Sequence, residues 1–226
     1  MSLTCNICKG TDFGPGPGGR LSVTGVLPYC MQCGSLERHR TFRQVFLDLG
    51  IGSFAGKSAL QFSQDNSVDP SWFGKYEVSI YQQHNSLDLM KIDRESDLYD
   101  IVVCNHVLEH VQYDNAALTE LTRVTRSDGF VFLTFPDPAR REHTVDWPEP
   151  RADQHYHWRL YGSDVLQRFA RYVPQMYIIS SDASDPATGA SDIVYFMTRS
   201  QNIANNITQR MNSARIEIDP KETIPV

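Results

Sequence analysis

Residues 99–111 read YDIVVCNHVLEHV and contain the clearest buried-strand signal in the sequence. The apolar run Ile101-Val102-Val103 is typical of a strand that is buried on both faces of a sheet. The polar residue Asn105 closes this strand. In open parallel sheets, ligands lie beyond the carboxyl ends of the strands, so Asn105 is expected to face a cleft. We therefore predict a central parallel strand over residues 100–105.

Segments with strand and helix periodicity alternate on both sides of this central run. The other expected strands cover residues 58–63, 78–81, 130–135, 176–180 and 193–198. The expected helices cover residues 35–49, 116–124 and 164–171. Strands that alternate with helices predict an α/β fold, with a Rossmann-like, mostly parallel sheet and helices on both faces. The last two strands could form an antiparallel hairpin at the sheet edge.

Composition divides the chain into three parts. Residues 1–36 are expected to form a small ribbon, residues 37–199 the domain that holds the sheet, and residues 200–226 a polar tail or helix. Apolar residues recur every four positions in the tail, at Ile203, Ile207 and Met211. A helix there could pack on the body or on a second subunit, which leaves a homo-oligomer through the tail open.

Two short patterns make local predictions. Asp128-Gly129 is typical of a turn, and it stands directly before the expected strand at residue 130. Arg38, His39 and Arg40 lie near the start of the first expected helix. Charged residues there are expected on the solvated face of the helix, and contact with a phosphate is the less favoured interpretation.

Two C-x-x-C pairs form the most specific short signal in the sequence. They are Cys5, Cys8, Cys30 and Cys33. Four thiolates at this spacing favour a tetrahedral zinc site without an open position, so we expect a structural zinc. The alternatives are two disulfides or four unrelated thiols. The fifth cysteine, Cys104, lies in the apolar central run and is expected to be a buried, inert thiol.

The totals describe an acidic protein of ordinary composition. The 226 residues carry a net charge of −6 and 41% are apolar, so a nucleic-acid partner is not favoured. No apolar run approaches the roughly 20 residues that span a bilayer, so no membrane span is predicted. Residues 1–57 hold six Lys and Arg against three Asp and Glu, which leaves a weak case for RNA contact through the ribbon. The N-terminus has no signal-peptide pattern, and paired thiolates suit a cytoplasmic protein.

Three segments of the sequence resemble those of a known protein family. YDIVVCNHVLEHV at 99–111, ALTELTRV at 117–124 and GFVFL at 129–133 resemble the class I S-adenosylmethionine-dependent methyltransferases. A subset of that family carries an N-terminal four-cysteine zinc ribbon and a following SLERHR-type helix, which this chain shows at 35–40. The resemblance implies S-adenosylmethionine as the cofactor, with a structural zinc in the ribbon.

The resemblance also implies which residues contact the cofactor. Asp88 would accept a hydrogen bond from the adenine amino group, and Leu89 would lie against the adenine plane. Asn105 and His106 would line the methionine end. The remaining expected contacts follow the first two strands of the sheet, at Phe62, Ser63, Asp65, Tyr81 and Gln82.

The chain departs from the family pattern at two loops. The first-strand loop, residues 60–67, reads LQFSQDNS without the usual glycines, and Asp65 stands where ribbon-bearing relatives have an acid. The segment SIYQQ at 79–83 has glutamines where the family has a ribose-binding acid. Two hypotheses therefore stay open. One is a methyltransferase acting on a small-molecule or glycan-like acceptor, or more weakly on RNA. The other is a catalytically silent, methyltransferase-like binding or scaffold protein that has lost cofactor binding.

The acceptor side is expected between the fifth strand and the helix that follows it. The segment 140–159 is rich in histidine, arginine and aromatic residues, and we predict that it forms a wall over the cleft with Tyr156 and His157 facing inward. His157 is the first candidate for a proton acceptor, and His106 is the second. Glu109 and His110 are expected to orient the turn after the central strand. His155 and His157 lack a third ligand at a useful spacing, so no metal is predicted there.

Overall fold

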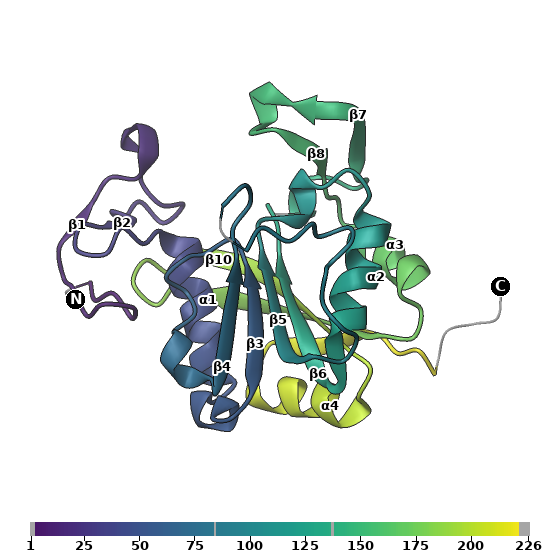
Figure 1. Ribbon diagram of the computed structural model, residues 1–226. Coiled ribbons are helices and arrows are strands. Elements are labelled where there is room, and N and C mark those ends of the chain that lie inside the picture. Colours follow the sequence, from purple (N-terminus) through teal and green to yellow (C-terminus); the bar gives the residue numbers. More distant parts are fainter. Residues whose placement is uncertain (1–2, 84, 137, 222–226) are drawn as a thin grey trace.

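Figure 1 shows the computed structural model of the chain, which describes residues 3–83, 85–136 and 138–221. A seven-stranded sheet forms its centre, in the order β11-β9-β10-β6-β5-β3-β4. The strands are β3 (Ser58–Phe62), β4 (Lys75–Ser79), β5 (Tyr99–Asn105), β6 (Thr125–Thr134), β9 (Tyr177–Ser184), β10 (Ser191–Thr198) and β11 (Ala214–Ile218). Neighbours β4, β3, β5 and β6 are parallel, whereas β10, β9 and β11 add antiparallel pairings. The predicted mostly parallel α/β fold is confirmed.

Strand β5 lies inside the sheet, as its apolar run predicted. Val102 is in register with Leu60 of β3 on one side and Val131 of β6 on the other. All seven residues of β5 are buried, including Cys104. Burial raises the pKa of the Cys104 thiol, so the thiol is protonated and inert, as expected.

Helices cover both faces of the sheet (Figure 1). They are α1 (Glu37–Asp48), α2 (Asp114–Val124), α3 (Val165–Tyr172) and α4 (Gln201–Arg210). On one face α1 buries Phe42, Val45 and Phe46, and each such side chain stabilises the fold by about 1.5–3 kcal/mol. On the opposite face α2 and α3 bury their apolar sides in a second cluster. Helix α1 ends where Gly50 adopts a φ of 83°, a left-handed conformation that glycine takes without steric cost.

The last part of the chain belongs to the sheet domain. The expected helix after residue 200 is present as α4, but the following strand β11 was not predicted, and it pairs with β9. Ile207 and Met211 are buried in the core cluster on the α1 face of the sheet. These two side chains therefore pack on the chain's own body and are not exposed to a second subunit.

The predicted turn at Asp128-Gly129 is wrong, because both residues lie within β6. A Cβ at Gly129 would collide with the carbonyl oxygen of Asp100 on the neighbouring strand. The glycine therefore allows two neighbouring strands to approach closely, and it does not reverse the chain. A second sheet, formed by β7 (Val145–Arg151) and β8 (His157–Leu160), was also not predicted.

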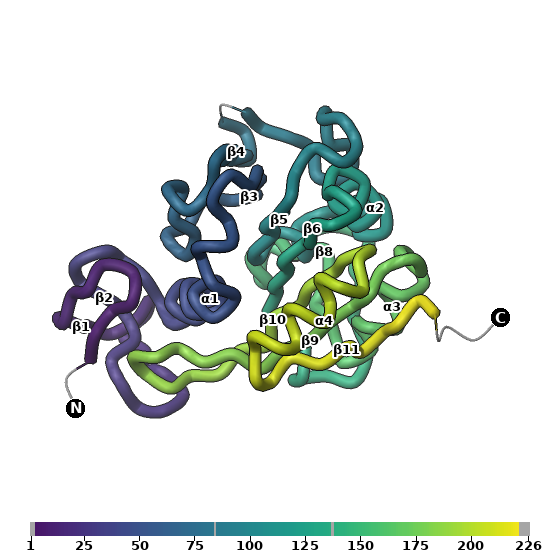
Figure 2. The backbone as a smooth tube through the Cα atoms, turned by 90° about the horizontal axis from the view of Figure 1, so that it is seen from below, coloured from purple at the N-terminus to yellow at the C-terminus, as the bar shows by residue number. Residues whose placement is uncertain are grey.

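The cysteine-bearing ribbon, residues 3–36, lies beside the sheet domain and contains β1 (Phe13–Gly14) and β2 (Tyr29–Cys30). Figure 2 shows that the loop between β9 and β10 extends to this ribbon. There the hydroxyl of Thr24 donates to the carbonyl oxygen of Thr188 at 2.7 Å. A segment near the end of the sheet domain thus helps to hold the N-terminal ribbon.

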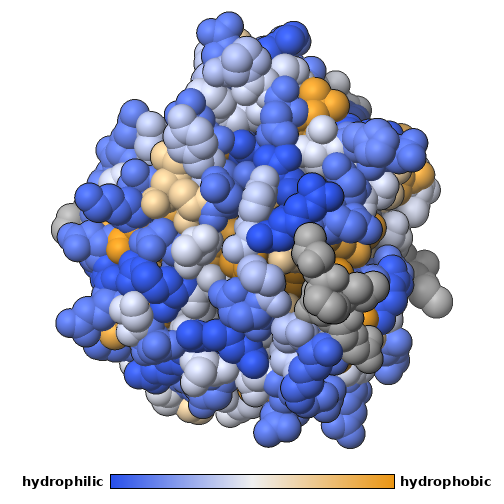
Figure 3. Space-filling model, turned by 90° about the vertical axis from the view of Figure 1, so that its right-hand side faces the viewer, coloured by the Kyte–Doolittle hydropathy of each residue, from blue (hydrophilic) through white to orange (hydrophobic). Residues whose placement is uncertain are grey.

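Figure 3 shows the side of the molecule that lies on the right in Figure 1. That face is mainly hydrophilic, and its hydrophobic residues form small separate patches. Within the described ranges, no helix has the length and apolar character needed to cross a membrane.

Candidate functional site

A cleft of about 690 Å³ opens at the carboxyl ends of β3 and β5. The first loop, the turn after β5, helix α1 and the segment that leads to β8 all contribute to its walls. The lining residues are Arg38, His39, Phe42, Ser63, Gln64, Asp65, Asn105, His106, Glu109, His110, Pro136, Arg140, Arg141, Gln154, His155, His157 and Leu160. The position agrees with the ligand site expected for an open parallel sheet.

The predicted site residues separate into two groups. Ser63, Asp65, Asn105, His106 and His157 line the cleft. The other group lies outside its lining: Phe62 and Leu89 are buried in the core, Tyr81 is 79% exposed, and Gln82 and Asp88 are also exposed. The structure thus brings together the residues expected at the methionine end of the cofactor, and those expected near the adenosine half remain predictions.

The backbone turns sharply where β3 and β5 end. Ser63 and His106 have φ values of 63° and 50°, a left-handed conformation that costs a residue with a side chain about 1–2 kcal/mol. Their amides donate to carbonyl oxygens of neighbouring strands, Ser63 to Ser79 at 2.9 Å and His106 to Thr134 at 3.0 Å. Ser63 therefore adopts the left-handed conformation that glycine takes without steric cost, although this loop contains no glycine.

Polar atoms that lack partners face this region. Nδ2 of Asn105 and Nε2 of His106 are buried without a hydrogen-bond partner among the described residues. Oδ1 of Asn105 accepts from the Thr134 hydroxyl at 3.4 Å. Buried polar groups are rarely left unsatisfied, so these atoms fit a polar ligand such as the amino-acid end of S-adenosylmethionine.

The segment around β8 forms a wall of the cleft, as predicted. Arg140, Arg141, His155 and His157 all contribute to the lining. The expectation for Tyr156 is wrong, because its side chain is 66% exposed and does not line the cleft. His155 and Tyr156 both have left-handed backbone conformations, with φ values of 56° and 61°. The chain turns here, so that Tyr156 is exposed although the next residue, His157, is buried.

Burial keeps two cleft histidines neutral. It lowers the pKa of His157 below the ordinary value, against the opposing effect of Glu109. Burial, together with the nearby charge of Arg38, lowers the pKa of His39 to about 4. Nδ1 of His39 accepts a hydrogen bond from the Leu36 amide at 3.1 Å, so its neutral form has a structural role.

Arg159 holds β8 against the turn that follows β5. Its side chain is almost fully buried, and it donates to the carbonyl oxygens of Leu108, Val111 and Gln112 at 3.3, 2.6 and 2.6 Å. It also pairs with Asp146 at 2.9 Å. Because His157 is two residues away on the same strand, these bonds set its position relative to the turn.

We expect Arg159→Lys to lower the free energy of unfolding by about 1–2 kcal/mol, because a lysine cannot reproduce the forked set of hydrogen bonds. Denaturant unfolding measures this change. Arg151→Lys is the matched control on the same hairpin, because Arg151 pairs with Asp153 at an exposed position, where no measurable change in the free energy of unfolding is expected. If Arg159→Lys lowered the free energy of unfolding no more than Arg151→Lys does, the positioning role of Arg159 would be contradicted.

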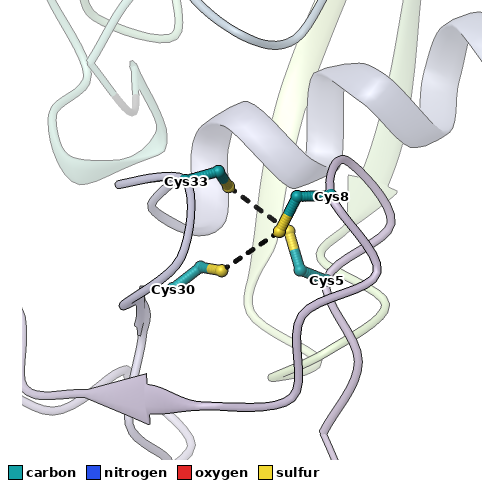
Figure 4. A group of neighbouring side chains, drawn as sticks. All are labelled: Cys5, Cys8, Cys30 and Cys33. Atoms are coloured by element: carbon teal, nitrogen blue, oxygen red, sulfur yellow. Dashed lines mark hydrogen bonds between the residues drawn. The ribbon is translucent and has the colours of Figure 1, made fainter.

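The four ribbon cysteines come together as predicted (Figure 4). Their Sγ atoms lie within 4.8 Å of one another, with Cys5–Cys33 at 3.7 Å and Cys8–Cys30 at 3.5 Å. A disulfide requires about 2.05 Å, whereas thiolates 2.3 Å from one tetrahedral zinc are about 3.8 Å apart. The amide of Gly10 donates to Sγ of Cys8 at 3.3 Å. This geometry fits four thiolates around one zinc ion and does not fit two disulfides.

Comparison with known proteins identifies the family. Residues 12–172 match a family of methyltransferase domains. A geranyl diphosphate methyltransferase in complex with S-adenosylmethionine has 12% identity and a TM-score of 0.50, over 70% of this chain and 85% of that chain. The 1,6-didemethyltoxoflavin-N1-methyltransferase of Burkholderia thailandensis has 13% identity and a TM-score of 0.49, over 70% and 77%. No curated protein sequence matches.

At such identities the solved structures show a shared fold alone. The family match carries the assignment, because it spans residues 12–172 of the 226 in the chain. The cleft at the carboxyl ends of β3 and β5 lies inside the matched region. This chain therefore belongs to the class I S-adenosylmethionine-dependent methyltransferases.

Proposed function

We propose that this protein transfers a methyl group from S-adenosylmethionine to a small-molecule or glycan-like acceptor in the cleft. One observation carries the proposal. The cleft of about 690 Å³ at the carboxyl ends of β3 and β5 presents buried polar atoms of Asn105 and His106 that have no partner within residues 3–83, 85–136 and 138–221. The cofactor supplies an activated methyl group, so the protein has to bind and align the two reactants.

The cofactor end of the cleft would be formed by residues from two strand exits. Ser63 and Asp65 follow β3, and Asn105 and His106 close and follow β5. The carboxylate of Asp65 accepts from the Ser67 amide at 2.7 Å, which ties the loop into a compact turn. We place the adenosine half near Tyr81, Gln82 and Asp88. No charged acceptor follows β4 in residues 80–83, so we expect weak cofactor binding.

The acceptor would meet a polar wall. Three arginines line the cleft, Arg38, Arg140 and Arg141, against two carboxylates, Asp65 and Glu109. This balance favours a polar or anionic acceptor that is small enough for the cleft. A nucleic-acid acceptor has little support from a protein with a net charge of −6. His106 and His157 both line the cleft, which keeps them the candidates for taking a proton from the acceptor.

Calorimetric titration with S-adenosylhomocysteine tests the proposal. We expect binding by the full-length protein, and Asp88→Ala should weaken it by about 1–3 kcal/mol, because a charged acceptor for the adenine amine is lost. Asp93→Ala is the control, since it removes an exposed carboxylate of the same charge nearby. The absence of binding at millimolar concentration would favour the silent scaffold protein.

We also propose that the ribbon holds one structural zinc through Cys5, Cys8, Cys30 and Cys33. The tetrahedral spacing of their sulfur atoms supports it. All four protein ligands are thiolates, so no position is left for water or substrate. A zinc–thiolate site of this kind suits a reducing, cytoplasmic setting.

A further inference from the structure

A second cluster of metal-ligating side chains lies within the cleft, apart from the cysteines. Ligand atoms of Glu109, His110 and His157 all lie within 4.8 Å of one another. Glu109 and His110 belong to the turn directly after β5, whereas His157 begins β8. We propose that these three residues bind one divalent first-row transition metal ion.

Burial without partners is the first argument for this metal site. Glu109 is 1% exposed and His157 is 6% exposed. Among the described residues, neither Oε2 of Glu109 nor Nδ1 of His157 has a hydrogen-bond partner. A buried carboxylate oxygen without a donor or cation is costly, because it has lost its hydration. The other carboxylate oxygen of Glu109, Oε1, lies 3.5 Å from Nδ1 of His106. A cation bound through Oε2 of Glu109 and Nδ1 of His157 would give a partner to the two atoms that lack one.

The arrangement of the side chains is the second argument. The rings of His110 and His157 meet edge to face, with centroids 4.6 Å apart. Metal–ligand distances of about 2.0–2.2 Å require donor atoms about 3.0–3.5 Å apart, so the cluster has to contract slightly around an ion. His110 is exposed and can rotate. His157 and the turn are held together by Arg159, which donates to the carbonyl oxygens of Leu108 and Val111.

The donor set indicates the class of metal. Two imidazoles and one carboxylate suit zinc, iron(II), cobalt(II) or manganese(II). Magnesium and calcium prefer oxygen ligands throughout and are less suited to it. Three protein ligands leave open positions, which would face the cleft because all three residues line it. His106 and His155 also line the cleft, and the ring of His155 lies 5.9 Å from that of His157.

The open coordination positions of the metal suggest a methyl acceptor that carries a hydroxyl group. This inference rests on the proposed methyl transfer. A metal-bound hydroxyl loses its proton more readily. Its oxygen would form the new bond to the methyl carbon while the sulfur–methyl bond breaks and its electron pair returns to sulfur. The products are the methyl ether and S-adenosylhomocysteine, and the hydroxyl proton goes to His106 and from there to solvent. His157 would then be a ligand, and His106 would remain to accept a proton.

Manganese binding to the full-length, zinc-containing protein tests the site. Loss of the free Mn²⁺ signal in electron paramagnetic resonance is expected to show one equivalent bound per chain. His110→Ala and Glu109→Gln should each weaken this binding at least tenfold. His143→Ala is the control, because His143 is exposed and does not line the cleft. Since His110 is exposed, its variant should fold normally, and the thermal midpoint verifies this.

The outcomes separate this site from the methyltransferase proposal. If neither Mn²⁺ nor Co²⁺ binds at millimolar concentration, or if His110→Ala and Glu109→Gln leave Mn²⁺ affinity unchanged, the metal site is wrong. The calorimetric titration with S-adenosylhomocysteine answers the other question by itself. Metal binding without cofactor binding would support the site and contradict methyl transfer.

Discussion

Asp185→Ala is expected to lower the free energy of unfolding by about 3–5 kcal/mol, the usual cost of leaving one buried charge without its partner. The side chains of Arg40 and Asp185 are both 0% exposed. Arg40 donates to both carboxylate oxygens of Asp185, from Nε at 2.9 Å and from the guanidinium end at 2.7 Å. Removing the carboxylate leaves the guanidinium in the interior with three of its five hydrogen bonds, those to Ser35 and Pro28.

The same pair joins three parts of the molecule. Arg40 lies in α1, and Asp185 lies in the loop between β9 and β10. The guanidinium also donates to the carbonyl oxygens of Pro28 at 2.8 Å and Ser35 at 2.9 Å, which belong to the ribbon. We therefore expect Asp185→Ala to loosen the ribbon as well, which hydrogen exchange of residues 3–36 would detect.

Denaturant unfolding of matched variants measures this pair. Arg20→Ala is the control, because the side chain of Arg20 is 45% exposed where it pairs with Glu37. Its expected effect is below about 1 kcal/mol. The double variant Arg40→Met/Asp185→Leu should recover part of the stability, since it removes the unpaired buried charge but leaves the carbonyl oxygens of Pro28 and Ser35 without this donor. A loss below 1 kcal/mol for Asp185→Ala would contradict the prediction.

Cys30→Ser should abolish zinc binding and unfold the ribbon while the sheet domain stays folded. A structural zinc supplies about 10–16 kcal/mol to the folding of a small module. The apolar cluster of the ribbon is small and is centred on Cys5, Phe13 and Cys30, so little else would stabilise it. The two large clusters on the sheet do not include these residues.

Metal analysis and limited proteolysis followed by mass spectrometry check this expectation. The wild-type protein should contain about one zinc per chain, and Cys30→Ser should contain almost none and be cleaved within residues 3–36. Cys104→Ala is the control, because Cys104 lies in β5 and not in the ribbon. Wild-type protein with well under half an equivalent of zinc, prepared without chelator, would refute the structural site.

Sequence patterns predicted the elements whose signals are local. The apolar run 101–103 predicted β5, and the spacing of Phe42, Val45 and Phe46 predicted α1, because burial is encoded in residues a few positions apart. The paired cysteines predicted their own cluster for the same reason. The strands β7, β8 and β11 were missed: β7 and β11 have no buried residue, and only alternate residues of β8 are buried.

Charged residues were harder to place than apolar ones. Arg40 was expected on a solvated helix face, and yet it is fully buried. The reason is a partner 145 residues away, Asp185, which no local pattern reveals. Its neighbours Arg38 and His39 line the cleft, where the turn after β5 and the first loop meet α1.

Short-range periodicity and residue spacing were enough to predict the fold class, the four-cysteine cluster and the position of the cleft beyond β5. Which side chains meet in that cleft depends on contacts between segments that are distant in the chain. Glu109 and His110 looked like parts of a turn, and His157 lacked a third ligand along the sequence. Their ligand atoms come within 4.8 Å because β8 packs on the turn after β5. Arg159 holds β8 there by donating hydrogen bonds to backbone carbonyl oxygens of the turn. Because every residue has a backbone carbonyl oxygen, the sequence does not reveal which residues accept these hydrogen bonds.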